Sequence, residues 1–87
     1  MEVVFTDTAQ EDLSYWKKSA NTAVRNKISR LIQEISQHPF SGTGKPEPLK
    51  HELSGYWSRQ INKEHRIVYR VQEDKVIVIS LRYHYTR

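Results

Sequence analysis

The spacing of hydrophobic residues changes once along this chain, from the period of a helix to the period of a strand. Between residues 22 and 37, apolar side chains recur every three or four positions, which is the spacing of one face of an α-helix. From Tyr56 onward apolar and polar side chains alternate, which is typical of strands. Because 87 residues leave room for one small core, we predict a single α+β domain over residues 1–87.

A short strand and a first helix are predicted at the N-terminus. Residues 2–5 include three β-prone side chains in a row, and Thr6 and Asp7 follow them as good N-cap residues. Asp7 and Gln10 resemble a capping box. We expect the helix to begin there and to be short and amphipathic.

The second helix has clear boundaries in the sequence. Asn21 or Thr22 can cap its N-terminus. His38 precedes Pro39, and this pair should end the helix because proline lacks the N–H that a continuing helix would use. The two helices are therefore expected to form an antiparallel hairpin.

Three strands are expected in the second half, joined by short turns that imply antiparallel pairing. They are predicted at residues 56–61, 66–71 and 75–83. In the last strand the apolar set expected to face the helices is Ile77, Ile79, Leu81 and Tyr83. The set expected on the opposite face is Val76, Val78, Ser80, Arg82 and His84. In the middle strand Ile67, Tyr69 and Val71 should face the helices, with Arg66, Val68 and Arg70 opposite.

A polar but restricted stretch, residues 44–59, connects the helices to these strands. Pro46 and Pro48 fix the backbone on both sides of Glu47 and push the preceding residues toward extended conformations. We therefore interpret the stretch as a positioned loop, and Glu47 as a candidate for chemistry.

The net charge of +4 is confined to the second half of the chain. Residues 1–44 contain five basic and five acidic side chains, whereas residues 45–87 contain nine and five. This asymmetry favours a polyanionic partner, although a solvated basic surface is an alternative. The chain has no cysteine and no apolar segment of the ~20 residues needed to span a bilayer. We expect a soluble intracellular protein without a metal or cofactor.

The second half also contains the groups needed to cleave RNA without a metal. That reaction requires a base for the 2′-hydroxyl, cations for the charge on phosphate and an acid for the departing 5′-oxygen. Glu47, arginines such as Arg59 and Arg66, and His84 could supply them. The alternative is that these are a solvated glutamate, surface arginines and a histidine without a role. The residue types alone leave both interpretations open.

Four ordered motifs resemble the YoeB (Txe) toxins of the RelE superfamily. They are Lys45-Pro-Glu-Pro-Leu-Lys-His, Leu53-Ser-Gly-Tyr-Trp-Ser-Arg, Glu64-His-Arg-Ile-Val-Tyr and Arg82-Tyr-His-Tyr. The resemblance implies a β-α-α-β-β-β fold, in which a two-helix hairpin packs on one face of a curved, mainly antiparallel sheet. It also implies a toxin of a bacterial type II toxin–antitoxin module that enters the ribosomal A site and cleaves mRNA there.

The resemblance assigns roles residue by residue. It matches Glu47 to the general base, Arg66 to the arginine that stabilises the phosphate, His84 to the general acid, and Tyr85 to the aromatic that organises the substrate. The residues expected to contact RNA or the ribosome are Lys45, Lys50, Arg59, Arg70 and Arg82. The sequence departs from many relatives at Gln60, where they have a second arginine; its phosphate contact could be absent or supplied by another residue such as Arg70. It also has the extra residues Thr86 and Arg87 after the His-Tyr pair.

The resemblance also implies partners. They are a YefM/Phd-like antitoxin whose disordered C-terminal segment covers the site, the 70S ribosome with its A-site mRNA, and a second copy in a homodimer. Operator DNA would be bound only through the antitoxin complex, and the protein would be cytoplasmic without membrane contact. The alternative function is inhibition by target occupation, as in ParE-like relatives, which lack the Glu/Arg/His set.

Overall fold

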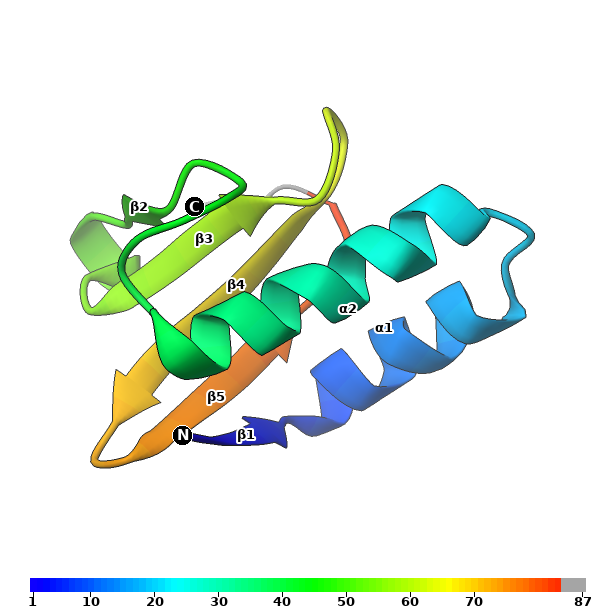
Figure 1. Ribbon diagram of the computed structural model, residues 1–87. Helices are drawn as coiled ribbons and strands as arrows, with labels where there is room; N and C mark the ends of the chain where they lie inside the picture. Colours follow the sequence, from blue (N-terminus) through cyan, green and yellow to red (C-terminus); the bar gives the residue numbers. More distant parts are fainter. Residues whose placement is uncertain (84–87) are drawn as a thin grey trace.

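Two helices pack on one face of a five-stranded sheet (Figure 1). The computed structural model describes residues 1–83. In chain order the elements are β1 (Glu2–Phe5), α1 (Asp7–Lys18), α2 (Thr22–Gln37), β2 (Glu47–Pro48), a 3₁₀ turn (His51–Leu53), β3 (Tyr56–Gln60), β4 (Arg66–Gln72) and β5 (Lys75–Ser80). The strand order is β1-β5-β4-β3-β2, and β1 and β5 form the parallel pair. The predicted helical hairpin on a mainly antiparallel sheet is confirmed, while the two-residue β2 was not foreseen.

The N-terminus of α1 is capped by Thr6. Its hydroxyl accepts a hydrogen bond from the backbone N–H of Ala9 at 3.2 Å, and its own N–H donates to the carbonyl of Val78 at 3.0 Å. Asp7 is therefore the first helical residue, and the predicted capping box between Asp7 and Gln10 is wrong. The contact with β5 determines the cap, because it fixes Thr6 at the point where the chain leaves the sheet.

Helix α2 has the predicted boundaries. Asn21 caps it through Oδ1, which accepts from the N–H of Val24 at 3.1 Å. His38 is the C-cap, directly before Pro39. An N-cap of this kind stabilises a helix by about 1 kcal/mol. Asn21 and His38 therefore define the two ends of α2.

The hydrophobic core fills the space between the helices and the sheet. The apolar stripe of α2, formed by Val24, Ile28, Leu31 and Ile35, is buried, and burial of one such side chain contributes about 1.5–3 kcal/mol. The buried cluster consists of Ala9, Trp16, Val24, Ile28, Leu31, Ile35, Ile61, Ile67, Tyr69, Val76, Val78 and Leu81. The helix-facing set predicted for β4 is confirmed, since Val71 also packs against this cluster.

Strand β5 contains a β-bulge opposite β4. Val68 pairs with Ser80, but the next residue of β4, Tyr69, pairs with Val78, so the pairing passes over Ile79. One extra residue reverses the face that the following side chains occupy. The alternation along β5 is therefore interrupted at Ile79.

The predicted faces of β5 are wrong before this bulge. Val76 and Val78 are buried in the core beneath the helices, where Ile77 and Ile79 were expected. Ile77 and Ile79 are only half-buried and lie outside the core cluster. After the bulge Leu81 is buried in the core as predicted. A strict alternation of buried and outward side chains cannot describe β5, because the bulge at Ile79 reverses which residues face the helices.

Strand β5 is also shorter than predicted, because it ends at Ser80 instead of Tyr83. The backbone N–H of Leu81 donates to Oδ2 of Asp12 on α1 at 2.9 Å, so it leaves the sheet ladder. Tyr83 has a φ of +61°, which is incompatible with a continuing strand. The chain therefore turns toward α1 at this point. Within residues 1–83, neither helix has the length and apolar character needed to cross a bilayer.

Candidate functional site

One row of paired residues crosses the sheet on the side away from the helices. Glu47 pairs with Ser58, Ser58 with Val68, and Val68 with Ser80. Residues that pair across neighbouring strands point to the same side, and Ile67 of β4 points to the helices. Its neighbour Val68 and the rest of the row therefore point away. We call this side of the sheet, which the helices do not cover, the open face; Ser58 and Val68 at its centre are nevertheless buried.

Glu47 is held at the edge of the open face by backbone hydrogen bonds on both sides. After it, the N–H of Leu49 donates to the carbonyl of Tyr56 at 2.9 Å, and before it the carbonyl of Gly44 accepts from the N–H of Gln60 at 2.7 Å. Gly44 has a φ of +88°, and a Cβ there would lie 3.0 Å from the carbonyl oxygen of Gln60. The predicted positioning of Glu47 therefore comes from pairing with β3 as well as from the prolines.

Arg66 lies on the same face at the start of β4, where it pairs with Gln60. It is two strands and two residues away from Glu47, so their Cα atoms are about 12 Å apart for interstrand spacings of ~4.8 Å and rises of ~3.4 Å. Nη1 of Arg66 donates to the carbonyl of Asn62 at 2.7 Å, which holds the guanidinium against the β3–β4 turn. Glu47 and Arg66 thus border one patch of the open face.

The backbone of Arg66 also contacts the C-terminal segment. Its N–H donates to the carbonyl of Tyr83 at 3.1 Å. That carbonyl belongs to the peptide joining Tyr83 to His84. The predicted acid His84 and the predicted aromatic Tyr85 themselves lie outside the described residues. Arg66 is therefore next to the peptide that leads into His84.

Lys45 and Lys50 are both exposed and flank the β2 edge that contains Glu47. Lys45 has a φ of +55°, a conformation that is uncommon for a residue with a Cβ. The two lysines place positive charge beside the sheet edge, as an RNA-contacting role requires.

Arg70 lies on the open face but far from Arg66. The two residues are four positions apart on β4, which corresponds to about 13 Å. Nη1 of Arg70 donates to Oε1 of Gln72 at 2.5 Å, so the side chain is bonded further along the strand. This position does not allow Arg70 to replace an arginine at Gln60.

Arg82 was expected on the open face, and this prediction is wrong. Its guanidinium carbon lies 3.7 Å from the ring centroid of Tyr15 on α1 and 4.6 Å from that of Tyr83. The chain has turned toward α1 after Ser80, which explains the change of side. The hollow beside this stack has a volume of about 480 Å³ and is lined by Tyr15, Lys63, Glu64, His65, Arg82 and Tyr83.

Arg59 is fully buried, so its predicted role on an RNA-binding surface is also wrong. It pairs with Ile67 and therefore lies on the helix-facing side of β3. Nη1 of Arg59 is 2.8 Å from Oε1 of Glu34 on α2, and Nε donates to the hydroxyl of Tyr69 at 3.2 Å. Arg59 follows the apolar Trp57 by two residues and so lies on the same face of the strand, which was the sequence signal that it faces the core.

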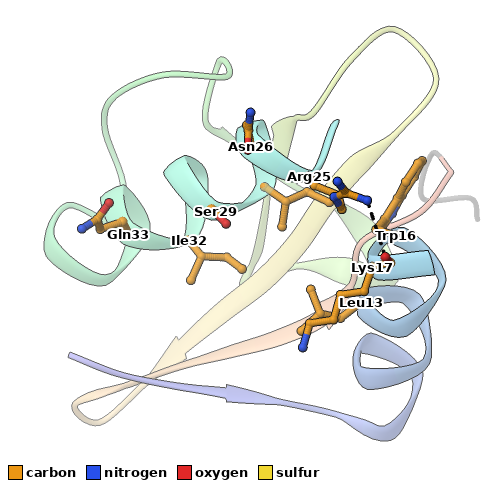
Figure 2. Close-up of a pocket in the computed structure, with 9 residues that line it drawn as sticks. Leu13, Trp16, Lys17, Arg25, Asn26, Ser29, Ile32 and Gln33 are labelled. Atoms are coloured by element: carbon orange, nitrogen blue, oxygen red, sulfur yellow. Dashed lines mark hydrogen bonds between the residues drawn. The ribbon is translucent and has the colours of Figure 1, made fainter. Parts of the chain in front are cut away.

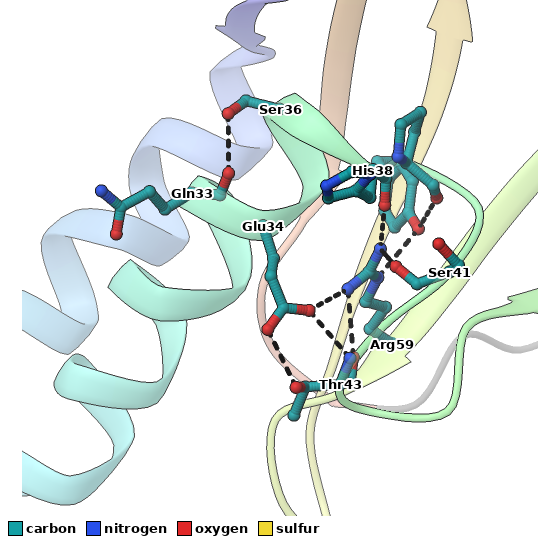
Figure 3. A network of polar contacts seen from close by, with 9 residues as sticks. Gln33, Glu34, Ser36, His38, Ser41, Thr43 and Arg59 are labelled. Carbon is teal, nitrogen blue, oxygen red and sulfur yellow. Dashed lines mark hydrogen bonds and ion pairs between the residues drawn. The ribbon is translucent and has the colours of Figure 1, made fainter.

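The same guanidinium fixes the loop that follows α2 (Figure 3). Nη2 donates to the carbonyls of His38 and Ser41 at 2.5 and 2.7 Å, and Nη1 donates to that of Thr43 at 3.1 Å. Thr43 in turn donates to Glu34 from its N–H at 2.8 Å and from its hydroxyl at 2.9 Å. We call these contacts the Arg59 network. They fix the segment that leads from α2 toward Glu47.

The similarity to known proteins covers nearly the whole chain. The model of the family described as "YoeB-like toxin of bacterial type II toxin-antitoxin system" matches residues 5–85. The chain belongs to the YoeB toxin family. It is 53% identical over 83 residues to Toxin RelK of Mycobacterium tuberculosis, covering 95% of this chain and 96% of that protein. It is therefore a toxin of a type II toxin–antitoxin system.

Solved YoeB structures have the same fold. The YoeB/ParE toxin from Agrobacterium tumefaciens aligns with a TM-score of 0.92 and 42% identity, covering 98% of this chain and 100% of that one. The YoeB of a YoeB–YefM complex and that of a YoeB dimer, both from Staphylococcus aureus, align with a TM-score of 0.86 at 40% and 38% identity. Each alignment covers 98% of both chains.

This YoeB-family toxin has a second, larger hollow between α1 and α2 (Figure 2). Its volume is about 680 Å³, and its lining residues are Leu13, Trp16, Lys17, Arg25, Asn26, Ile28, Ser29, Ile32 and Gln33. No residue predicted to act in catalysis or RNA binding lines it. The open face and this groove are therefore separate features of the toxin.

Two side chains bonded to Arg59, those of Glu34 and Tyr69, have shifted pKa values. The backbone N–H and hydroxyl of Thr43 hold the pKa of Glu34 below its usual value, and the ion pair with Arg59 adds to this effect. Burial raises the pKa of Tyr69. Tyr69 therefore keeps its proton and donates to the carbonyl of Pro39 at 2.6 Å.

The lowered pKa of Glu34 predicts acid sensitivity of the YoeB-family fold. A carboxylate with a depressed folded pKa stabilises the protein above its unfolded value, about 4.3 for glutamate, and this contribution is lost as pH falls through the folded value. Glu34→Gln should therefore be less stable than the wild type at pH 7, and the difference should shrink toward pH 3. Urea unfolding at pH 7, 5, 4 and 3 measures it.

The matched control is Glu11→Gln, which changes an exposed glutamate of α1. At pH 7 it should change stability by less than about 0.5 kcal/mol. A deficit of Glu34→Gln that stays constant or grows toward acid pH would contradict the role assigned to the carboxylate.

Proposed function

We propose that this toxin is a metal-independent endoribonuclease that cleaves mRNA in the A site of the ribosome. The observation that supports this most directly is the hydrogen bond of 3.1 Å from the N–H of Arg66 to the carbonyl of Tyr83. It joins the main chain of Arg66, the residue proposed to bind the phosphate, to the peptide that leads into His84, and strand pairing puts Arg66 on the sheet face that also holds Glu47. This supports a site to which Glu47 contributes the base, Arg66 the cation and His84 the acid.

In this proposal Glu47 starts the reaction. Its carboxylate takes the proton of the ribose 2′-hydroxyl, and the 2′-oxygen forms a bond to the adjacent phosphorus. Negative charge develops on the phosphate oxygens, and the guanidinium of Arg66 stabilises it. The nucleophile belongs to the RNA, so the protein contributes alignment and charge.

His84 completes the reaction by giving a proton to the departing 5′-oxygen as its bond to phosphorus breaks. The products are a 2′,3′-cyclic phosphate and a 5′-hydroxyl. Tyr85 would organise the substrate beside it, and Lys45 and Lys50 would contact the RNA or ribosomal backbone through their charges. Histidine suits this step because its ordinary pKa, about 6.5, leaves a proton available near neutral pH.

The proposed partners follow the solved relatives. YoeB of Staphylococcus aureus has been solved with YefM and as a dimer, which supports a YefM/Phd-like antitoxin and a homodimer for this chain. The antitoxin would inhibit by covering the open face, and operator DNA would be bound through that complex. The substrate is held by the 70S ribosome, so the toxin would act in the cytoplasm.

Incubation of the purified toxin with programmed ribosomes tests the function, with the 5′ ends of the mRNA mapped afterwards. The wild type should give one new 5′-hydroxyl end within the A-site codon. Glu47→Gln should lower the single-turnover rate by about 10²- to 10⁴-fold, because it removes the base. Inhibited translation with intact mRNA would instead indicate target occupation and refute the proposal.

Glu52→Gln is the matched control for Glu47→Gln. Glu52 is an exposed glutamate of the neighbouring 3₁₀ turn and has no part in the proposed chemistry. It should cleave at the wild-type rate. Equal loss in both variants would mean that charge near β2, and not a base at Glu47, sets the rate.

A further inference from the structure

Residues 81–83, which we call the C-terminal strap, are held by side chains to which the sequence motifs assign no role. The N–H of Leu81 donates to Oδ2 of Asp12 at 2.9 Å, and its carbonyl accepts from the indole N–H of Trp16 at 2.9 Å. At the other end the N–H of Tyr83 donates to Nδ1 of His65 at 2.8 Å. Helix α1 and the β3–β4 turn thus fix the strap at both ends.

The bond from Tyr83 defines the chemical state of His65. A backbone N–H always donates, so Nδ1 of His65 must be the unprotonated nitrogen of a neutral ring with its proton on Nε2. The ring packs edge-on against Trp16 with centroids 4.9 Å apart, and its centroid lies 5.6 Å from that of Tyr83. Oε1 of Glu64 lies 4.0 Å from Nε2 of His65, and the His65 side chain is 13% exposed. These contacts orient the ring with its acceptor toward the strap.

Tyr83 has a backbone conformation that requires such support. Its φ of +61° is uncommon for a residue with a bulky side chain and persists where surrounding contacts determine it. Two hydrogen bonds hold its main chain: its N–H donates to His65 and its carbonyl accepts from the N–H of Arg66. Together they set the direction in which the chain leaves Tyr83.

We propose that His65 is a positioning residue, which fixes the start of His84 through the backbone of Tyr83. This inference rests on the proposed function, because it gives His65 its effect through the general acid. His84 follows Tyr83 directly, so a displaced Tyr83 displaces the imidazole that must reach the 5′-oxygen. His65 does not touch the RNA in this proposal, and its neutral Nδ1 acts on the toxin's own main chain.

Two substitutions separate the acceptor of His65 from its ring. His65→Asn keeps an acceptor, because Oδ1 is bonded to Cγ as Nδ1 is. His65→Phe keeps an aromatic ring against Trp16 but has no acceptor. If the acceptor positions His84, the single-turnover cleavage rate should fall about 10- to 100-fold in His65→Phe and stay close to wild type in His65→Asn. Ribosome affinity should be unchanged in both. His65→Leu is a second acceptor-free variant, for use if His65→Phe fails to fold.

Amide hydrogen exchange at Tyr83 supplies a readout that does not need activity. Exchange should be slow in the wild type and His65→Asn and faster in His65→Phe, with the rest of the sheet unaffected. Wild-type cleavage with equal rates in all variants would overturn the positioning role and leave the proposed function intact. Absence of cleavage by the wild type would overturn the proposed function, and exchange at Tyr83 would then decide whether His65 holds the strap.

Discussion

Arg59→Leu should unfold far more readily than the wild type, with a loss of about 3–5 kcal/mol, as expected when a fully buried side chain at the centre of a hydrogen-bond network is removed. Arg59 has no exposed surface and bonds to Glu34, Tyr69 and three backbone carbonyls. Leucine fills part of the space but donates no hydrogen bond, so those acceptors lose their partner in the interior. Urea unfolding at pH 7 measures the loss, and the midpoint of thermal unfolding should fall by roughly 4–8 °C per kcal/mol.

Arg30→Leu is the matched control for this experiment. Arg30 is an exposed residue of α2, and arginine and leucine have similar helix propensities. This variant should stay within about 0.5 kcal/mol of the wild type. A loss below about 1 kcal/mol in Arg59→Leu, the value of an exposed ion pair, would show that the Arg59 network does not hold the loop after α2.

His84→Gln should lower the single-turnover rate of mRNA cleavage by about 10²- to 10⁴-fold while leaving stability unchanged, because it removes the proposed acid. The role can be tested further with an mRNA that carries sulfur in place of the departing 5′-oxygen. A thiolate leaves without protonation, so the sulfur substrate should restore most of the lost rate.

His38→Gln is the control, since His38 has an exposed side chain at the end of α2 and takes no part in the proposed reaction. It should cleave both substrates as the wild type does. Wild-type cleavage of the oxygen substrate by folded His84→Gln would refute the assignment. A defect of equal size on both substrates would show that His84 has some role other than that of the acid.

Local patterns in the sequence predicted most of the fold. The stripe on α2 and the alternation on β4 gave the correct buried faces because each element keeps one period throughout. The same reasoning gave the wrong faces for strand β5, because its pairing with β4 passes over Ile79 and the buried and outward faces of the strand exchange there. A bulge depends on how two strands pair, and no residue type in β5 indicates it.

The candidate site was only partly predictable for a similar reason. Motifs identified Glu47 and Arg66, and pairing through β3 brings them onto one face. Trp16 and His65 were not identified as supports, because their partners in the strap lie 65 and 18 positions away in sequence. Arg59 was misplaced because its charge was given more weight than its position two residues after Trp57, on the same face of the strand. The ion pair with the half-buried Glu34 accommodates that charge.

The position of β5 in the sheet bears on the order in which this toxin can fold during its own synthesis. β5 is the last strand within residues 1–83, yet it lies between β1 and β4. The first strand must therefore wait for a partner from the opposite end of the chain, and such long-range pairing forms late in folding. A chain that has been synthesised only as far as β4 lacks this interior strand and the strap. We expect β1 to stay unpaired on such a chain until β5 has left the ribosome.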